Sequence, residues 1–107
     1  MKKIHKTDIT IKPLQKNLPH LSSIIDQMLQ LEATQHISIL SKQAILQDLE
    51  QENYHYYYMM ICDEIVGYLS FSTVADTMDL QSIVIAKPWQ RHHLASLLLD
   101  KMIQFAR

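Results

Sequence analysis

The chain carries one glycine, Gly67, among its 107 residues. Average usage of about 7% would place roughly seven glycines in a chain of this length. Glycine lets the backbone adopt positive φ angles without steric cost and lets a ligand approach the backbone closely. A function that needs a phosphate site lined by glycines therefore requires specific evidence in this chain.

The remaining composition is that of one globular domain. Apolar residues make up 48% of the chain, charged residues make up 20%, and three prolines are present. Disordered tails are richer in charge, and collagen and low-complexity chains need far more glycine and proline. The length suits a single core, and neither a repeat nor a linker interrupts it. We therefore expect one domain over residues 1–107.

Charge and cysteine content restrict the partners and the compartment. Ten basic residues face eleven acidic ones, whereas a nucleic-acid module usually has a basic face. The tyrosine-rich stretch 54–58 has no interleaved Arg or Lys, which favours sheet packing over base stacking. No apolar run reaches about eighteen residues, so no membrane span is expected. Cys62 is alone, which suits a reducing cytoplasm and predicts a buried structural thiol.

The start of the chain is locally basic. Its first sixteen residues contain one aspartate and five lysines: Lys2, Lys3, Lys6, Lys12 and Lys16. A signal peptide would need a long apolar segment after the basic residues, and none follows. The pattern predicts a solvated basic end.

The sequence opens with a short strand and a helix. Ile9 and Ile11 alternate with polar residues, and Pro13 fits the end of such a strand or a sheet edge. Asn17 is a candidate helix cap, and Pro19 suits a first turn. The helical spacing is shared by five apolar residues: Leu21, Ile24, Ile25, Met28 and Leu29.

A second helix and a hairpin should follow. Ser41 can cap a helix that stops near Asn53. The dense run Tyr54–Cys62 predicts a strand buried on much of both faces. Asp63-Glu64 should form the turn into a second strand over 65–72, and the turn could exceed two residues because Asp-Glu is poor hairpin chemistry.

The last part of the chain leads from a strand into a helix. A loop is expected over 74–77, a third strand over 79–85 and a break over 86–89, before a helix over 91–106. The element order β-α-α-β-β-β-α predicts an α+β fold, a mixed α/β layer. The junction leaves free backbone amides at the helix start, which is a natural site for an anion.

The segment 80–100, LQSIVIAKPWQRHHLASLLLD, together with this element order, resembles the acetyl-CoA-binding core of GNAT-type N-acetyltransferases. Within that superfamily the chain is most similar to ribosomal-protein-alanine N-acetyltransferases, which modify a protein N-terminal amino group. The segment DEIVGY, residues 63–68, also resembles the hairpin before the family's cofactor strand. The resemblance runs over almost the whole chain.

The family signature after the fourth strand is Gln/Arg-x-x-Gly-x-Gly/Ala. The resemblance implies that the corresponding loop and helix start hold the pyrophosphate of acetyl-CoA: Gln90, Arg91, His92, His93, Leu94, Ala95 and Ser96. His93 stands in the place of the first glycine, so its side chain could block the approach of phosphate oxygens. With helical dihedrals His93 would carry no backbone penalty, and a protonated imidazole would favour the diphosphate. We expect weakened rather than abolished binding.

The resemblance also implies that Ile83, Val84 and Ile85 line the pantetheine arm through main-chain groups, and that a main-chain amide of this strand stabilises the oxyanion. Asp79 resembles the position of a general-base glutamate in histone-acetyltransferase-like members. Burial would tune such a carboxylate for work near neutral pH, and the alternative is an ordinary solvated aspartate. His92 and His93 have no Cys or Glu at a ligand spacing, so no metal site is expected.

The function implied by this resemblance is acetyl transfer from acetyl-CoA to an amine, either a protein N-terminus or a small molecule. In the ribosomal-protein branch a Glu and a Tyr that follow this helix carry the acid and base roles, and the chain stops at Arg107. We therefore expect a fold truncated after the cofactor-binding helix. Two alternatives stay open: a catalytically silent acetyl-CoA-binding or protein-interaction module, and a fragment completed by a second chain. An exposed sheet edge also makes a homodimer possible.

Overall fold

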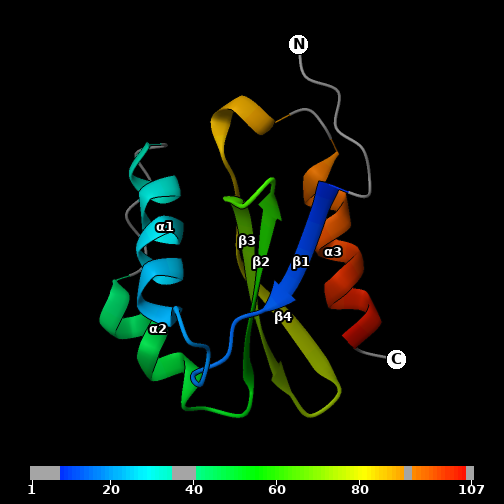
Figure 1. The fold of residues 1–107 in the computed structure, drawn as a ribbon. Coiled ribbons are helices and arrows are strands. Elements are labelled where there is room, and N and C mark those ends of the chain that lie inside the picture. The colour runs from blue at the N-terminus through cyan, green and yellow to red at the C-terminus, as the bar shows by residue number, and fades with distance from the viewer. Residues whose placement is uncertain (1–7, 35–40, 91–92, 106–107) are drawn as a thin grey trace.

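The computed structural model describes residues 8–34, 41–90 and 93–105 (Figure 1). The elements are β1 (Ile9–Pro13), α1 (Leu21–Thr34), α2 (Lys42–Leu49), β2 (Tyr54–Ile61), β3 (Glu64–Val74), β4 (Thr77–Ile85), the short 3-10 helix η2 (Lys87–Trp89) and α3 (Leu94–Phe105). This order confirms the predicted α+β class. Within those ranges, no helix is both long and apolar enough to cross a bilayer.

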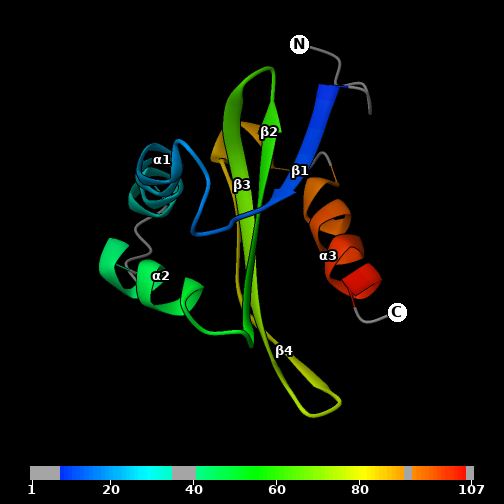
Figure 2. The ribbon, with the colours of Figure 1, turned by 60° about the horizontal axis from the view of Figure 1, so that its bottom comes forward.

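The four strands form one antiparallel sheet in the order β1-β2-β3-β4. Helices α1 and α2 cover one face of this sheet, and α3 covers the other (Figures 1 and 2). The long β3–β4 hairpin extends past the helices at one end, as Figure 2 shows. Strands β1 and β4 are therefore the two edges of the sheet.

Each face of the sheet has its own apolar core. The core under α1 and α2 includes Tyr56, Tyr58 and Tyr68, and the core under α3 includes Met59, Leu69 and Phe71. Alternate residues of β2 thus enter opposite cores, as the period of two in a strand requires. This arrangement confirms the prediction that the Tyr54–Cys62 run is buried on both faces.

Of the two predicted helix caps, Ser41 and Asn17, the structure contains one. Ser41 caps α2, since its Oγ accepts a hydrogen bond from the Ala44 N–H at 3.1 Å. Asn17 does not cap α1: the helix begins at Leu21, and the Ile24 N–H donates to the His20 carbonyl at 3.0 Å. The cap prediction for Asn17 was wrong because the chain makes a further turn around Pro19 before the helix begins.

Both hairpins close through two-residue turns. The first turn consists of Cys62 and Asp63, with φ angles of 50° and 67°, because Ile61 pairs directly with Glu64. The predicted Asp63-Glu64 turn was therefore one residue out of register, and no longer turn is needed. Cys62 is exposed at this turn, so the prediction of a buried thiol was also wrong.

The second turn replaces the loop predicted over 74–77. Val74 pairs with Thr77, which leaves only Ala75 and Asp76 between the strands. Ala75 has a φ of 52°, whereas Asp76 does not have a positive φ. Both hairpins thus use residues with a Cβ at positions that usually favour glycine.

The same substitution should act oppositely in the two turns. Asp63→Gly is expected to raise the free energy of unfolding by about 0.5–1 kcal/mol, because Asp63 has a positive φ that glycine adopts without strain. Asp76→Gly should lower it by a similar amount, because there glycine only adds freedom to the unfolded chain. Urea denaturation of both variants checks this, and an equal effect of the two would contradict it.

Candidate functional site

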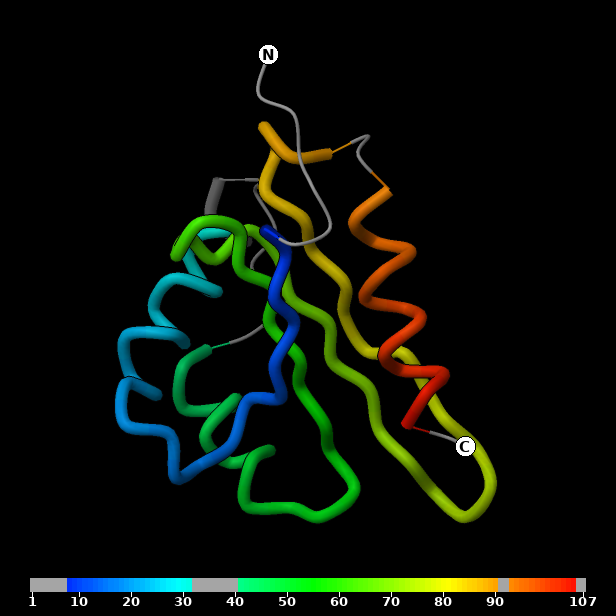
Figure 3. The backbone as a smooth tube through the Cα atoms, turned by 45° about the vertical axis from the view of Figure 1, so that its right-hand side comes forward, coloured from blue at the N-terminus to red at the C-terminus, as the bar shows by residue number. Residues whose placement is uncertain are grey.

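The candidate site lies where β4 ends and the chain turns towards α3. The Ala86 N–H donates to the Val66 carbonyl at 2.7 Å, which extends the β3–β4 ladder by one residue. Pro88 then favours the single turn of η2, and the Trp89 N–H donates to the Ala86 carbonyl at 2.8 Å. Gln90 is extended again, with φ −67° and ψ 156°. Figure 3 shows this turn at one end of the molecule, between β4 and α3.

The strand register fixes which main-chain groups face the outer edge of β4. In an antiparallel ladder, residues alternate between turning their N–H and C=O groups to the neighbour and turning them away. The Ala86–Val66 hydrogen bond places Ala86 among the inward-facing residues, and Val84 and Ser82 with it. Ile83 and Ile85 consequently direct their N–H and C=O groups to the outer edge. The side-chain amide of Gln90 donates to the Ile85 carbonyl there, at 3.0 Å.

A bulge and a glycine shape this end of the sheet. The β3–β4 register shifts between Ser70 and Phe71, where Gln81 is the extra residue of β4. Gly67 pairs with Ile85, and a Cβ at Gly67 would lie 2.8 Å from the Val84 carbonyl oxygen and 2.7 Å from Ile85 Cδ1. The single glycine therefore serves close packing of the strand end and not a turn, and its φ is not positive.

His93 has a φ of 59° immediately before α3. His93 therefore does not have the helical dihedrals that would spare it a backbone penalty. Its backbone occupies the left-handed region that favours glycine. The sequence predicted that the last helix begins at Arg91. The angle at His93 explains why α3 begins at Leu94 instead. The exposed imidazole stands at the helix N-terminus, where a partial positive charge attracts anions.

The structure brings most of the predicted cofactor residues together around this turn. Val84 and Ile85 are buried and Ile83 is half-buried, with Val84 in the core under α1 and Ile85 in the core under α3. Leu94 is buried and anchors the helix start, while Ser96 is exposed. Gln90 is exposed and Ala95 half-buried, and Arg91 and His92 lie outside the described residues.

Asp79 lies far from this turn, near the start of β4, where it pairs with Ser72. Its side chain is exposed, so the burial that a base role was expected to require is not observed. A partly buried polar array lies next to it: Ser70 Oγ donates to Ser82 Oγ at 3.2 Å, and the Gln81 amide donates to Ser72 Oγ at 3.1 Å. Among the described side chains, no group of three or more His, Cys, Asp or Glu could hold a metal ion.

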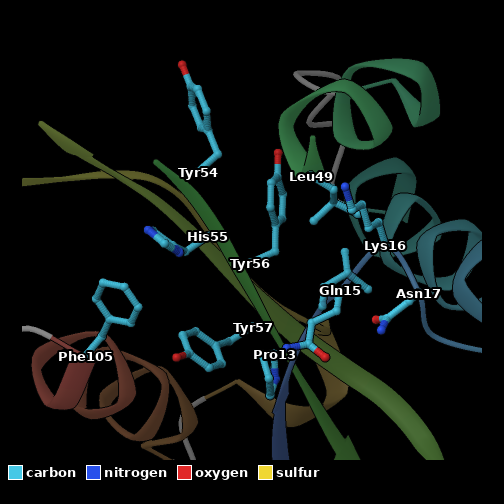
Figure 4. A pocket seen from close by; sticks show the side chains of 11 residues that line it. Pro13, Gln15, Lys16, Asn17, Leu49, Tyr54, His55, Tyr56, Tyr57 and Phe105 are labelled. Atoms are coloured by element: carbon cyan, nitrogen blue, oxygen red, sulfur yellow. The ribbon is translucent and has the colours of Figure 1, made fainter. Parts of the chain in front are cut away.

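A cavity that the sequence did not predict lies at the opposite end of the sheet. It has a volume of about 560 Å3 and opens where β1 stops and leaves the first residues of β2 uncovered. Its walls come from β2, the segment after β1, and the ends of α2 and α3 (Figure 4): Pro13, Leu14, Gln15, Lys16, Asn17, Leu49, Tyr54, His55, Tyr56, Tyr57 and Phe105. Three tyrosines of the stretch 54–58 line this cavity, although their pattern in the sequence favours sheet packing.

His55 is enclosed by aromatic rings next to this cavity. Its ring centroid lies 4.9 Å from that of Phe71 and 4.3 Å from that of Phe105, and its Nε2 lies 3.4 Å from Thr73 Oγ1. None of these neighbours carries a charge. Burial therefore lowers the pKa of His55 below its usual value, because the charged form loses solvation.

The lowered pKa of His55 predicts a loss of stability in mild acid. As the pH falls below about 6.5, the unfolded chain takes up the proton before the folded chain does. The stability linked to the neutral ring is complete above that pH and is lost as the pH falls towards the lower pKa of the folded state. His55→Phe keeps the ring stack and removes the titration, so its urea midpoint should fall less between pH 7.5 and 5.5. Parallel curves for both proteins would contradict this.

Residues 24–107 match the model of the Acetyltransferase (GNAT) family. Because the match covers most of the chain, this protein belongs to that family, as its sequence had indicated. No curated protein matches the chain by sequence.

Solved structures support the same fold. An aminoglycoside acetyltransferase, meta-AAC0020, from an uncultured soil metagenomic sample is 22% identical with a TM-score of 0.75, over 94% of this chain and 71% of that one. The ribosomal-protein-S18-alanine N-acetyltransferase from Escherichia coli is 18% identical with a TM-score of 0.74, over 92% of this chain and 59% of that one. An N-acetylglutamate synthase from Neisseria gonorrhoeae, complexed with coenzyme A and N-acetyl-glutamate, is 16% identical with a TM-score of 0.68. That match covers 99% of this chain and 23% of that one.

Proposed function

We propose that this protein binds acetyl-CoA at the outer edge of β4 and the start of α3, and transfers the acetyl group to an amine. The observation that carries the proposal is the orientation of Ile83, whose main-chain groups face an edge that no described strand covers. An amide-containing pantetheine arm can pair with such an edge as an added strand does. Family membership supports the same placement.

The residues around the turn suit the other end of the cofactor. The start of a 12-residue helix has main-chain amides without helical acceptors, and it attracts a diphosphate. Gln90, His93, Ala95 and Ser96 surround this helix start, and Arg91 and His92 are assigned to it from sequence alone. His93 should weaken the contact, because its Cβ and ring occupy the place that glycine leaves open.

The transfer would form a C–N bond to the acceptor and break the C–S bond of the thioester. The acceptor nitrogen gives up a proton, and coenzyme A leaves as the thiol. An outward-facing N–H of β4 would stabilise the negative charge that develops on the thioester oxygen. We keep Asp79 as the proposed base, reached through water, because it is the carboxylate on the same strand.

A silent acetyl-CoA-binding module is the second candidate function. The observation that favours it is the exposure of Asp79, since the burial expected of a catalytic carboxylate on this strand is not observed. Under this reading the chain binds the cofactor at the same place but does not release thiol. The two candidates therefore share the binding test and differ in the turnover test.

Binding is tested by calorimetry and thermal shift with acetyl-CoA. We expect saturable binding to the native protein and at least a fivefold loss of affinity in Ile83→Pro, which removes an outward N–H but no ladder hydrogen bond. The matched control is Ile11→Pro on the opposite edge, which should bind acetyl-CoA as the native protein does. Absence of binding at millimolar acetyl-CoA, or equal losses in both variants, would contradict the proposed site.

Turnover is tested by thiol release with two acceptors, a peptide that begins with alanine and an aminoglycoside. The peptide follows the ribosomal-protein-S18-alanine N-acetyltransferase from Escherichia coli. The aminoglycoside follows the metagenomic aminoglycoside acetyltransferase. The proposal expects release with one of them and a loss of at least tenfold in Asp79→Asn. Binding without release would assign the silent function.

We also propose a cytoplasmic location for this protein and a homodimer that forms through a sheet edge.

A further inference from the structure

The second edge of the sheet, β1, has outward-facing main-chain groups that no described strand covers (Figures 1 and 2). The Leu14 N–H donates to the Tyr56 carbonyl at 2.8 Å, which places Leu14, and by alternation Thr10, among the residues that face β2. Ile9 and Ile11 therefore turn their N–H and C=O groups outward. An edge of this kind can pair with a further strand.

Helix α3 leaves this edge open. It packs mainly against β3 and β4, which β2 separates from β1. A groove of about 390 Å3 lies between β1 and α3, lined by Ile9, Thr10, Ile11, Leu97 and Lys101. Ile9 and Ile11 are half-buried on this side of the sheet, so a strand added to β1 would extend an apolar surface.

The segment 8–12, DITIK, is complementary to itself when two copies run in opposite directions. It has an acidic residue first and a basic residue last, with an isoleucine next to each. In an antiparallel pair centred on Thr10, Ile9 of one copy lies opposite Ile11 of the other, and the acidic residue lies opposite the basic one. Because Ile9 and Ile11 both face outward, the N–H of each can donate to the C=O of the other.

Pro13 and the charges favour this register over the adjacent ones. A pair centred on Ile11 would place Pro13 opposite Ile9, and proline has no N–H to donate. A pair centred on Ile9 would separate the opposite charges. The register centred on Thr10 uses both outward donors and brings the opposite charges together.

The charges that meet in this register are exposed. Asp8 directly precedes β1, Lys12 lies within it, and both side chains are exposed. Two-fold symmetry repeats their contact on either side of Thr10. An exposed carboxylate accepts several hydrogen bonds, so this contact does not require Asp8 to be without a partner in its own chain. The net charge of −1 per chain adds little repulsion between copies.

We infer that two copies of this chain pair through β1, antiparallel and centred on Thr10, so that their two sheets continue as one. Ile9 and Ile11 of both copies then form one apolar strip on the face that α3 covers, because the side chains of paired residues share a face. The inference gives the homodimer proposed above its edge and its register. It is independent of the acetyl-CoA site, which lies on the opposite edge.

Sedimentation velocity of the full chain tests which edge forms the dimer. The paired stretch is short, so we expect a weak dimer with a dissociation constant of about 10–100 µM. Ile11→Pro removes an outward N–H from each copy and should weaken the dimer about tenfold, while Ile83→Pro should not. A monomer at about 300 µM would overturn the inference. A dimer weakened by Ile83→Pro and not by Ile11→Pro would keep a homodimer and overturn its assignment to β1.

Exchange of the two charges tests the register. Asp8→Lys brings two cations together and Lys12→Asp brings two carboxylates together, so each should weaken the dimer about tenfold. The double variant Asp8→Lys/Lys12→Asp restores opposite charges and should dimerise as the native chain does. An equimolar mixture of the two single variants should form a heterodimer more tightly than either forms a homodimer.

The matched control is Glu52→Lys, which makes the same change of net charge at an exposed position between α2 and β2. It should leave the dimer unchanged. Equal weakening by Glu52→Lys and Asp8→Lys would show a general charge effect and overturn the register. A double variant that stays as weak as the single variants would overturn it as well.

Discussion

Replacing Gly67 by alanine is expected to lower the free energy of unfolding by about 2–3 kcal/mol, and the thermal midpoint by about 10–20 °C. The physical reason is the space at this position, where an added Cβ would lie 2.8 Å from the Val84 carbonyl oxygen and 2.7 Å from Ile85 Cδ1. The carbonyl belongs to the backbone of β4 and cannot move without shifting the strand. Differential scanning calorimetry of the native and variant proteins measures the effect.

A double variant separates the two contacts. Gly67→Ala/Ile85→Val removes the Cδ1 contact and leaves the carbonyl contact, so it should recover only part of the lost stability. Ser70→Ala, three residues along β3, is the control for a change at a buried position that already has a Cβ, and it should cost about 1 kcal/mol. Full recovery in the double variant would show that the backbone contact is not limiting.

Replacing His93 by glycine is expected to raise the affinity for acetyl-CoA about tenfold and the free energy of unfolding by about 1 kcal/mol. Two causes act together: glycine adopts the φ of 59° without strain, and its lack of a side chain opens the helix start to the diphosphate. Calorimetric titration measures the affinity, and thermal denaturation without ligand measures the stability. The affinity part rests on the proposed function, whereas the stability part does not.

His93→Ala separates the ring from the backbone angle. Alanine removes the imidazole but keeps the Cβ, so it should give part of the affinity gain and little of the stability gain. An imidazole that donates a hydrogen bond to the diphosphate would produce the reverse, a loss of affinity in both variants. That reverse result would show that His93 is a ligand and not an obstacle.

The elements of the fold were predictable because their patterns are local. Alternation at Ile9 and Ile11, the cap at Ser41 and the dense run after Asn53 each specified an element that the structure contains. The turn positions were not predictable from composition. Cys62 and Ala75 adopt positive φ angles that their residue types disfavour, and strand pairing imposes those angles from both sides.

The candidate site was predictable as a segment but not as a geometry. The run from Ile83 to Ser96 was found by its resemblance to a family, and the structure places its described residues around one turn. The left-handed backbone of His93 was not predicted, because the backbone angle between a strand and the following helix depends on how the two elements pack and not on the local residue pattern. The exposure of Asp79 and the enclosure of His55 depend on neighbours from other strands, which no local pattern specifies.

The scarcity of glycine also acts on the unfolded chain. Each glycine replaced by another residue lowers the conformational entropy of the unfolded chain, which stabilises the folded state by about 0.4–1 kcal/mol. Roughly six fewer glycines than average therefore favour folding by a few kcal/mol. The four described residues with positive φ, at about 1 kcal/mol each, oppose folding by a similar amount. The gain is spread along the chain, whereas the strain is concentrated at two hairpin ends and one helix start. Amide hydrogen exchange should therefore begin at these three places, while the strands between them remain closed.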